Sequence, residues 1–180
     1  MIFNNLRANL MEHVRYDDIS LVPGNINDFE FYYSLKCEQS NIIWSGFIGK
    51  PEREKLLSWY KNNVLDKMCE FFIIKYNNID VGALYFKFNS TEICEFLGIG
   101  ISEKYQGKGI AVFALKRFIE YIVNNYPFCK IITTLIREDN LKSQQAFKRA
   151  GFSFSGKIED KYLYSIGHKI KMQRFEIELN

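Results

Sequence analysis

Apolar side chains recur along this chain with two different periods, which predicts a mixture of strands and helices. Three β-rich runs follow one another at residues 71–76, 79–88 and 91–102. The pair Asn77-Asn78 separates the first two runs and is typical of a tight hairpin turn, and Asn89-Ser90 indicates a second turn. Together these runs predict an antiparallel meander of three strands.

The N-terminal part of the chain predicts one strand and two helices. Residues 16–22 predict a first strand, which a Pro-Gly pair ends. A helix capped by Asn27 or Asp28 is expected to follow. Residues 51–64 predict a second helix, because they begin with proline and carry acidic residues where the helix dipole favours them. We expect the stretch between the two helices, 41–50, to be a loop rich in large apolar side chains.

The C-terminal half begins with a helix that is expected to end near Asn124 and a β-branched strand at 130–136. Two strands joined through a helix favour parallel pairing with a right-handed crossover, so we expect 91–102 and 130–136 to be parallel. Asn140 is expected to cap a short helix that Gly151 closes.

The last two strands are expected at 152–164 and 169–179. Apolar and charged residues alternate over 175–179, which predicts one buried face. Ile170 and Met172 have the opposite parity, which predicts a bulge between the two sets. The whole pattern indicates the α+β class, with about seven mostly antiparallel strands in a mixed α/β arrangement and about four helices.

Length and composition agree with this fold class. The 180 residues are expected to form a single domain, 1–180. Hydrophobic residues make up 47% and charged residues 25%, as in soluble globular proteins. The net charge of +3 is small and lysines alternate with glutamates, so no nucleic acid partner is expected. No apolar run is long enough to span a membrane and no signal peptide is visible, which predicts a cytoplasmic protein without membrane contact.

Cysteine and histidine usage narrows the possible chemistry. The four cysteines stand far apart without a C-x-x-C pair, so we expect buried free thiols in a reducing compartment. Only His13 and His168 are present, which makes a metal site improbable. No metal is therefore expected.

The loop 102–109 is the first candidate for chemistry, because it is polar, contains two glycines and leads into an apolar helix. A helix N-terminus offers unpaired N–H groups and a positive dipole end, both of which favour a phosphate. Gly107 and Gly109 lack a Cβ, so an anion can approach the backbone closely. The alternative is a plain turn. The spacing fits neither a Walker loop nor the G-x-G-x-x-G dinucleotide fingerprint.

The run 106–111, QGKGIA, resembles the Q/R-x-x-G-x-G/A motif of the GNAT superfamily of acetyl-CoA-dependent N-acetyltransferases. Residues 138–152, EDNLKSQQAFKRAGF, resemble the second signature of that family. The resemblance covers about residue 70 to the C-terminus and implies the GNAT fold with acetyl-CoA as cosubstrate. The C-terminal stretch 151–179 resembles the branch of the family that contains ribosomal-protein N-terminal, spermidine and amino-sugar acetyltransferases.

The resemblance also implies a set of cofactor contacts. The backbone of 106–111 would bind the CoA pyrophosphate, and the strand before it would pair with the pantetheine arm, where an N–H would polarise the thioester carbonyl. For Asn140 the alternative is helix capping alone. The expected cofactor residues are Ile99, Ile101, Gln106, Gly107, Lys108, Gly109, Ile110, Ala111, Asn140, Ser143 and Phe147. Lys104, Lys108, Lys148 and Arg149 are candidates for the ribose phosphate.

Acetyl transfer to an amine requires a proton acceptor, because a free alkyl amine has a pKa of about 10. Glu95 has the offset from Gln106 that the general-base glutamate has in the histone-acetyltransferase branch, and Glu92 is the reserve. The alternative places Glu95 in solvent or against an arginine. Many relatives carry a proton-donating Tyr where this chain has Phe147. A thiol has a pKa of about 8.5, so the thiolate can leave without a strong acid.

The acceptor site is expected between the first two helices and the tail strands. Trp44, Phe47 and Trp59 would stack on a sugar or base there, or would belong to the core. The expected partner is a small-molecule amine acceptor such as a nucleotide-linked amino sugar, because no acidic cluster suits a polyamine. A protein N-terminus is the close alternative, and a non-catalytic CoA-binding module is a further one. The chain is expected to be a monomer or homodimer.

Overall fold

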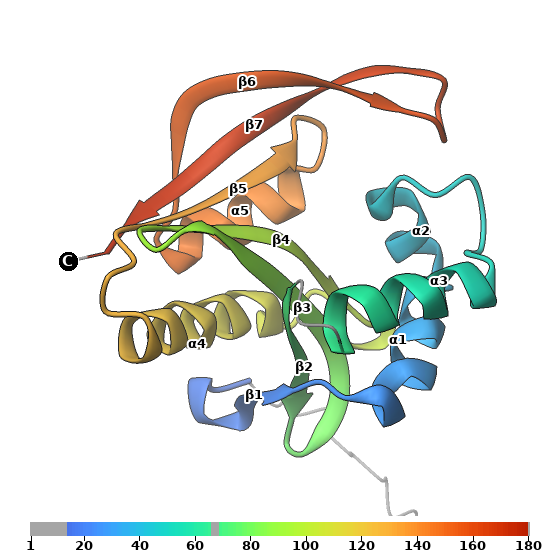
Figure 1. The fold of residues 1–180 in the computed structure, drawn as a ribbon, viewed down its shortest axis with the longest axis horizontal. Coiled ribbons are helices and arrows are strands. Elements are labelled where there is room, and N and C mark those ends of the chain that lie inside the picture. The colour runs from blue at the N-terminus through green and yellow to red at the C-terminus, as the bar shows by residue number, and fades with distance from the viewer. Residues whose placement is uncertain (1–13, 66–68, 180) are drawn as a thin grey trace, which may run out of the picture.

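The computed structural model describes residues 14–65 and 69–179. Within these ranges seven strands form one mixed sheet in the order β1-β2-β3-β4-β5-β7-β6, flanked by five α-helices (Figure 1). The strands are β1 (Ile19–Pro23), β2 (Glu70–Tyr76), β3 (Ile79–Ser90), β4 (Ile93–Ile101), β5 (Ile131–Arg137), β6 (Ser153–Leu163) and β7 (His168–Glu178). The helices are α1 (Phe29–Lys36), α2 (Gln39–Ser45), α3 (Arg53–Tyr60), α4 (Ile110–Asn125) and α5 (Leu141–Ala150). The predicted α+β class is confirmed, with one helix more than expected.

The predicted meander is formed by β2, β3 and β4. Asn77 and Asn78 have φ angles of 48° and 65°, as a tight hairpin turn with two left-handed residues requires. The second turn lies two residues later than expected, at Thr91 and Glu92. Ser90 still pairs with Ile93, so the strand ladder continues through the predicted turn.

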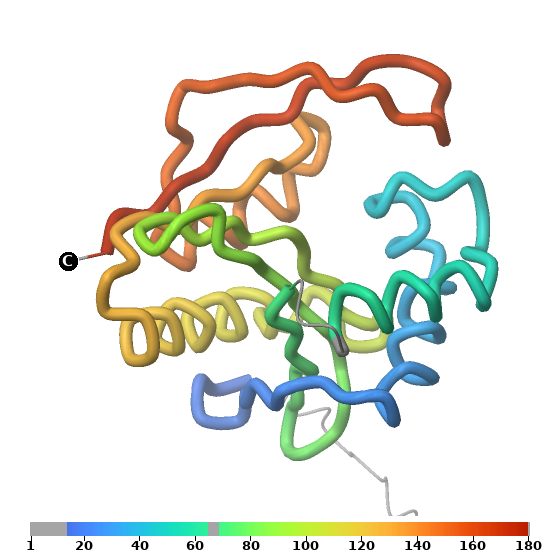
Figure 2. The backbone as a smooth tube through the Cα atoms, in the orientation of Figure 1, coloured from blue at the N-terminus to red at the C-terminus, as the bar shows by residue number. Residues whose placement is uncertain are grey.

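The expected parallel pairing is also confirmed. Ile93 to Phe96 of β4 pair in parallel with Ile131 to Thr134 of β5, and α4 provides the crossover. The C-terminal strand β7 then inserts between β5 and β6, antiparallel to both. This hairpin of β6 and β7 arches away from the rest of the sheet, and its tip extends toward α2 (Figure 2).

Successive side chains of a strand point to opposite faces of the sheet, and apolar residues on both faces form two hydrophobic cores. In β2, Phe72 and Ile74 pack into the core that includes α4, whereas Phe71 and Ile73 pack against α1 and α3. All four side chains are at most 4% exposed. Because both faces are covered, the strand reads as a continuous apolar run in the sequence.

Three sequence-based expectations need correction. Residues 41–50 are not all loop, because α2 covers Gln39–Ser45. At the N-terminus of α2 the backbone N–H of Ser40 donates a hydrogen bond to the carboxylate of Glu103 at 2.7 Å. Glu103 is far from α2 in the sequence, so local sequence patterns could not reveal this contact. Residues Tyr16–Asp18 form a 3-10 turn rather than the start of a strand.

The third correction concerns the bulge predicted in the last strand. The pairing of β7 with β5 is continuous, so Met172 and Phe175 lie on opposite faces of the sheet, and both are buried. The register shift lies instead in β6, between Phe154 and Ile158, where Gly156 has a φ of 81°. That 1–180 form a single domain stays a prediction.

Candidate functional site

The candidate site is a cleft at the end of β4 where this strand no longer pairs with β5. Figure 1 shows the two strands. In the described residues the two strands pair only as far as Phe96. The next residue, Leu97, is an extra one, because Phe96 pairs with Phe86 and Gly98 pairs with Tyr85 on β3. A bulge of this kind bends a strand and ends its pairing. The open end of β4 therefore borders a cleft of about 400 Å³.

The glycine loop forms one end of this cleft. Gly107 and Gly109 have φ angles of 76° and 84°, a region that side chains with a Cβ rarely adopt. Gly109 is also the N-cap of α4, and no side chain caps the helix there. The first N–H groups of a helix have no intrahelical partners, so they are available to an anion in the cleft.

The loop is held rigidly against α2 and the end of β4. The amide of Gln106 donates hydrogen bonds to Ser40 Oγ and to the Ile101 carbonyl oxygen, each at 2.9 Å. The carboxylate of Glu38 accepts from Ser102 Oγ at 2.7 Å and from Glu103 N at 2.9 Å. These contacts preorganise the loop before any ligand binds.

The opposite wall of the cleft is α5. Asn140 Oδ1 accepts a hydrogen bond from Ser143 N at 3.1 Å, and Gly151 ends the helix with a φ of 112°. The predicted caps of this helix are therefore confirmed. Asn140 and Ser143 both line the cleft as well, so capping leaves them beside the site.

The cleft brings together ten of the eleven residues that the resemblance assigned to the cofactor. They are Ile99, Ile101, Gln106, Gly107, Gly109, Ile110, Ala111, Asn140, Ser143 and Phe147. Lys108 is not among the lining residues, and neither are Lys104 and Lys148, whereas Arg149 is. The ammonium groups of Lys104 and Lys108 lie over the ring of Tyr105 instead. Contact of these residues with a cofactor stays a prediction.

Sequence reasoning missed part of the lining. The missed residues include Ser40 and Asn41 from α2, Tyr105, and Lys142 and Gln145 from α5. The α2 residues were missed because the segment was expected to be a loop. Lys142 and Gln145 stand two and five residues after Asn140, off the helix face shared by Asn140, Ser143 and Phe147, so helix periodicity does not indicate them.

Phe147 is a wall of the cleft and part of the core at once. Its side chain is 2% exposed and packs edge-on against Phe96 and Phe152, with ring centroids 5.4 Å and 5.0 Å away. A phenyl ring offers no proton to a leaving group, so no acid is assigned here.

The carboxylate of Glu95 lies outside the cofactor cleft, on β4 before the bulge. It accepts a hydrogen bond from Asn89 Nδ2 at 3.0 Å and forms an ion pair with Lys87 at 3.3 Å. Its side chain is 29% exposed. Glu92 pairs with Lys130 at the other end of β4, far along the strand from the glycine loop. His168 is exposed on β7, and His13 lies outside the described residues.

The three aromatic residues expected near the acceptor have different surroundings. Trp44 is 42% exposed, lines the cleft, and lies 5.0 Å from the guanidinium of Arg137. Phe47 is half-buried just beyond α2. Trp59 packs beside the core formed with α1 and α3, stacked on Tyr32 at 5.9 Å.

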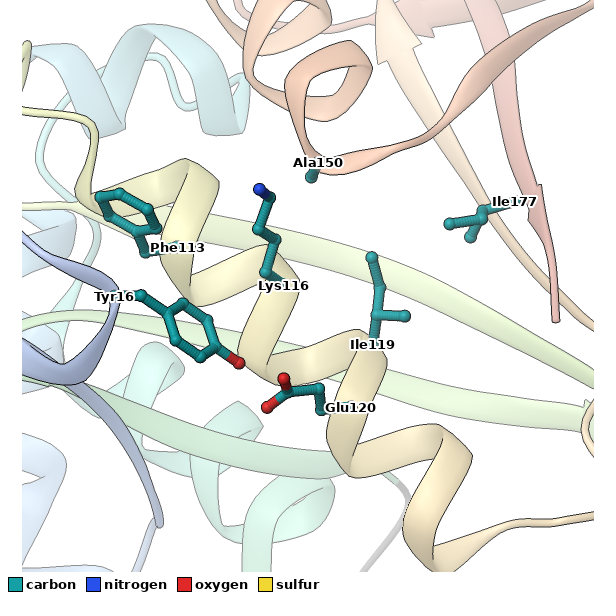
Figure 3. Close-up of a pocket in the computed structure, with 7 residues that line it drawn as sticks. All are labelled: Tyr16, Phe113, Lys116, Ile119, Glu120, Ala150 and Ile177. Atoms are coloured by element: carbon teal, nitrogen blue, oxygen red, sulfur yellow. The ribbon is translucent and has the colours of Figure 1, made fainter. Parts of the chain in front are cut away.

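A second hollow of about 430 Å³ lies along α4 (Figure 3). Phe113, Lys116 and Ile119 of α4 face it, with Tyr16 at one side and Ile177 across from it. No residue that the sequence assigned to the site lines this hollow.

The sequence predicted neither a metal site nor a membrane-spanning helix. Among the described residues no cluster of three metal-ligating side chains occurs, and no helix there is long and apolar enough to cross a membrane.

The four cysteines are free, as expected, with Cys69, Cys94 and Cys129 buried. Burial raises the pKa of each of these three thiols, so they remain protonated and unreactive. Catalysis by a thiolate is not supported at these positions.

An α+β sheet that splits between two parallel strands, with a glycine loop at a helix N-terminus beside the split, has a geometry suited to a phosphate-bearing ligand. Residues 33–152 match the model of the acetyltransferase (GNAT) family, and the chain belongs to that family. Enzymes of this family use acetyl-CoA as cosubstrate.

Three similar proteins are all acetyltransferases, and two of them are described with different acceptors. A spermine/spermidine N(1)-acetyltransferase of Bacillus subtilis (strain 168) is 37% identical over 59 residues, or 33% of this chain. This match spans only 38% of the length of that relative. The other two are solved structures.

The first solved structure is the Salmonella typhimurium acetyltransferase that modifies the N-terminal serine of ribosomal protein L7/L12. It has a TM-score of 0.78 at 15% identity and covers 93% of this chain and 99% of its own. The second is the microcin C7 self-immunity acetyltransferase with acetyl-CoA and AMP. It has a TM-score of 0.73 at 20% identity, and the match covers 91% of this chain and 93% of that protein. At these identities the likeness establishes the fold.

Proposed function

We propose that this chain transfers the acetyl group of acetyl-CoA to a primary amine by direct attack in a ternary complex. The observation that carries the proposal is the cleft itself, which joins the glycine loop at the N-terminus of α4 to the end of β4 that pairs with β3 but no longer with β5. The loop suits a pyrophosphate, and the open strand edge suits an extended chain that hydrogen-bonds like a strand.

In this reaction the amine nitrogen attacks the thioester carbon, the C–S bond breaks, and the thiolate leaves. The backbone from Gln106 to Ala111 would bind the pyrophosphate, and the edge from Ile99 to Ile101 would hold the pantetheine arm. An N–H of β4 beside the thioester would stabilise the negative charge that develops on the carbonyl oxygen. Phe147 would confine the arm by packing.

Glu95 is our proposed proton acceptor, acting directly or through water. Its support is its place on β4, only four residues before Ile99, and its partial exposure to solvent. The ion pair with Lys87 and the hydrogen bond from Asn89 would hold the carboxylate in one position on this part of the strand. Substitution Glu95→Gln tests this role, with Glu92→Gln in the turn just before β4 as the comparison, because Glu92 is likewise paired with a lysine.

For the acceptor we propose a small amine, such as a nucleotide-linked amino sugar. Aromatic side chains at Trp44 and Phe47 near α2 would stack on a sugar or base. The microcin C7 self-immunity acetyltransferase, which shares this fold, binds AMP. A protein N-terminus is the second candidate, favoured by the TM-score of 0.78 to the ribosomal-protein acetyltransferase.

The test is a thiol-release assay with acetyl-CoA over amino-sugar nucleotides, spermidine, aminoglycosides and N-terminal peptides. Turnover of peptides alone would refute the small-amine proposal. Calorimetry with acetyl-CoA runs in parallel, because binding without any turnover would indicate the non-catalytic module. Absence of binding would refute the proposed function altogether.

A further inference from the structure

Lys36 is a buried lysine that the proposed reaction does not use. It lies in the last turn of α1, and the residue is only 8% exposed. Its Nζ donates a hydrogen bond to Ser45 Oγ at 3.1 Å. Among residues 14–65 and 69–179 no carboxylate forms an ion pair with it. Buried lysines are normally paired, so this one lacks the anion that its burial calls for.

The neighbours of Lys36 supply aromatic surface but no negative charge. Its ammonium lies 5.5 Å from the ring centre of Tyr32 and 5.9 Å from that of Tyr85. Burial raises the pKa of Tyr85 to about 12 and that of Tyr32 well above its usual range, so both phenols stay neutral. Burial also lowers the pKa of Lys36 to about 8, which leaves roughly nine-tenths of it charged at pH 7.

Lys36 borders the side of β4 from which an acceptor would approach. The opposite side of the open end of β4 is filled by the core, with Ile99 and Ile101 packed there. On the side of Lys36, Gly98 leaves room for Tyr85, whose hydroxyl would be 3.0 Å from a Cβ at that position. The ring of Tyr85 therefore lies next to both the ammonium and the strand that would hold the thioester.

The hydrogen-bond partner of Lys36 lies at the protein surface. Its partner Ser45 is exposed, at the C-terminal end of α2. The next residue, Gly46, faces the tip of the β6–β7 hairpin, because a Cβ there would lie 3.3 Å from Leu163 Cδ2. The hydrogen-bonded partner of the ammonium therefore lies where α2 and this hairpin approach each other.

We propose that Lys36 binds an anionic group, a phosphate or a carboxylate, on the amine acceptor. The acceptor class is then an amine that carries a negative charge, and polyamines are disfavoured because their second ammonium would approach Lys36. The proposal rests on the proposed acetyl transfer and narrows its substrate. An anion here would complete the hydrogen bonding and charge that the protein leaves open.

The direct test uses protein saturated with CoA, so that the cofactor cleft is occupied. Inorganic phosphate, AMP and acetate are titrated by calorimetry into the wild type, Lys36→Met, Lys36→Arg and the exposed-lysine control Lys61→Met. We expect at least one anion to bind the wild type, Lys36→Arg and Lys61→Met, and binding to Lys36→Met to weaken at least tenfold. The phosphate and acetate arms distinguish the two anion chemistries. Equal affinity in Lys36→Met, or no binding to the wild type, would overturn the proposal.

The second test measures kcat/KM for matched acceptors, such as glucosamine 6-phosphate beside glucosamine, with spermidine as the cationic comparison. We expect the wild type to favour the anionic member at least tenfold and Lys36→Met to lose that preference, with the neutral member nearly unchanged. Turnover without any anion preference would refute the role of Lys36 and leave the proposed acetyl transfer intact. Failure of acetyl-CoA to bind would refute the proposed function instead, and the anion titration, repeated without CoA, would still decide whether Lys36 binds an anion.

Discussion

Replacing Lys36 with Met tests the energetic basis of the buried ammonium. Burial lowers the pKa of Lys36 from 10.5 to about 8, so the folded state favours the neutral amine. Below pH 8 the lysine is protonated in both the folded and unfolded states, and the folded state bears a penalty of about 3 kcal/mol. As the pH rises from 8 toward 10.5, the unfolded chain still binds the proton and the folded chain does not. The stability of the wild type should therefore rise by about 2 to 3 kcal/mol between pH 7 and pH 10 from this group alone.

The assay is urea unfolding of the wild type, Lys36→Met and Lys61→Met at pH 7 and pH 10. Other titrating groups are common to all three proteins, so they cancel when the pH effects are subtracted. The hydrogen bond to Ser45 is lost at both pH values and cancels as well. We expect Lys36→Met to be the more stable protein at pH 7 and to lack the rise of about 2 to 3 kcal/mol. Equal pH dependence in the wild type and Lys36→Met would refute the reasoning, whereas Lys61→Met should follow the wild type.

Three further predictions concern the cleft and its strands. Gly109→Val should lower stability by about 1 to 2 kcal/mol in urea unfolding, because a β-branched residue is strained at a φ of 84°, and should weaken acetyl-CoA binding measured by calorimetry. Asn140→Ala should cost about 1 kcal/mol of stability through loss of the cap to Ser143 N, and an unchanged unfolding midpoint would contradict that cap. Glu95→Gln should reduce kcat by about a hundredfold with little change in acetyl-CoA affinity, and an unaltered pH–rate profile would exclude Glu95 as the base.

Local patterns predicted the elements whose causes are themselves local. The hairpin of β2 and β3 follows from two adjacent asparagines in left-handed conformations, and α5 follows from Asn140 and Gly151 at its two ends. The glycine loop was also recognisable in the sequence, because glycine readily adopts positive φ angles, and the structure has such angles at Gly107 and Gly109.

Distant contacts explain the expectations that failed. The helix α2 depends on Glu103, a carboxylate from the loop after β4, to accept the hydrogen bond of Ser40 N. The register shift beside β7 lies in β6, where Gly156 bends the strand, and the apolar parity of β7 alone could not locate it. In both cases the residue responsible, Glu103 or Gly156, belongs to a different segment of the chain, so the periodicity of the element itself could not reveal it.

The sequence by itself determined the fold class, the order of the elements and the loop that would receive a pyrophosphate, because each depends on short-range periodicity, capping and backbone freedom. Only the tertiary structure decided how the cleft is assembled. The bulge at Leu97 ends the pairing of β4 with β5, and α2 brings Ser40 and Asn41 to the opening. The burial of Lys36 against neutral tyrosines was likewise invisible in the sequence, because the dielectric environment of a charge depends on which distant side chains surround it.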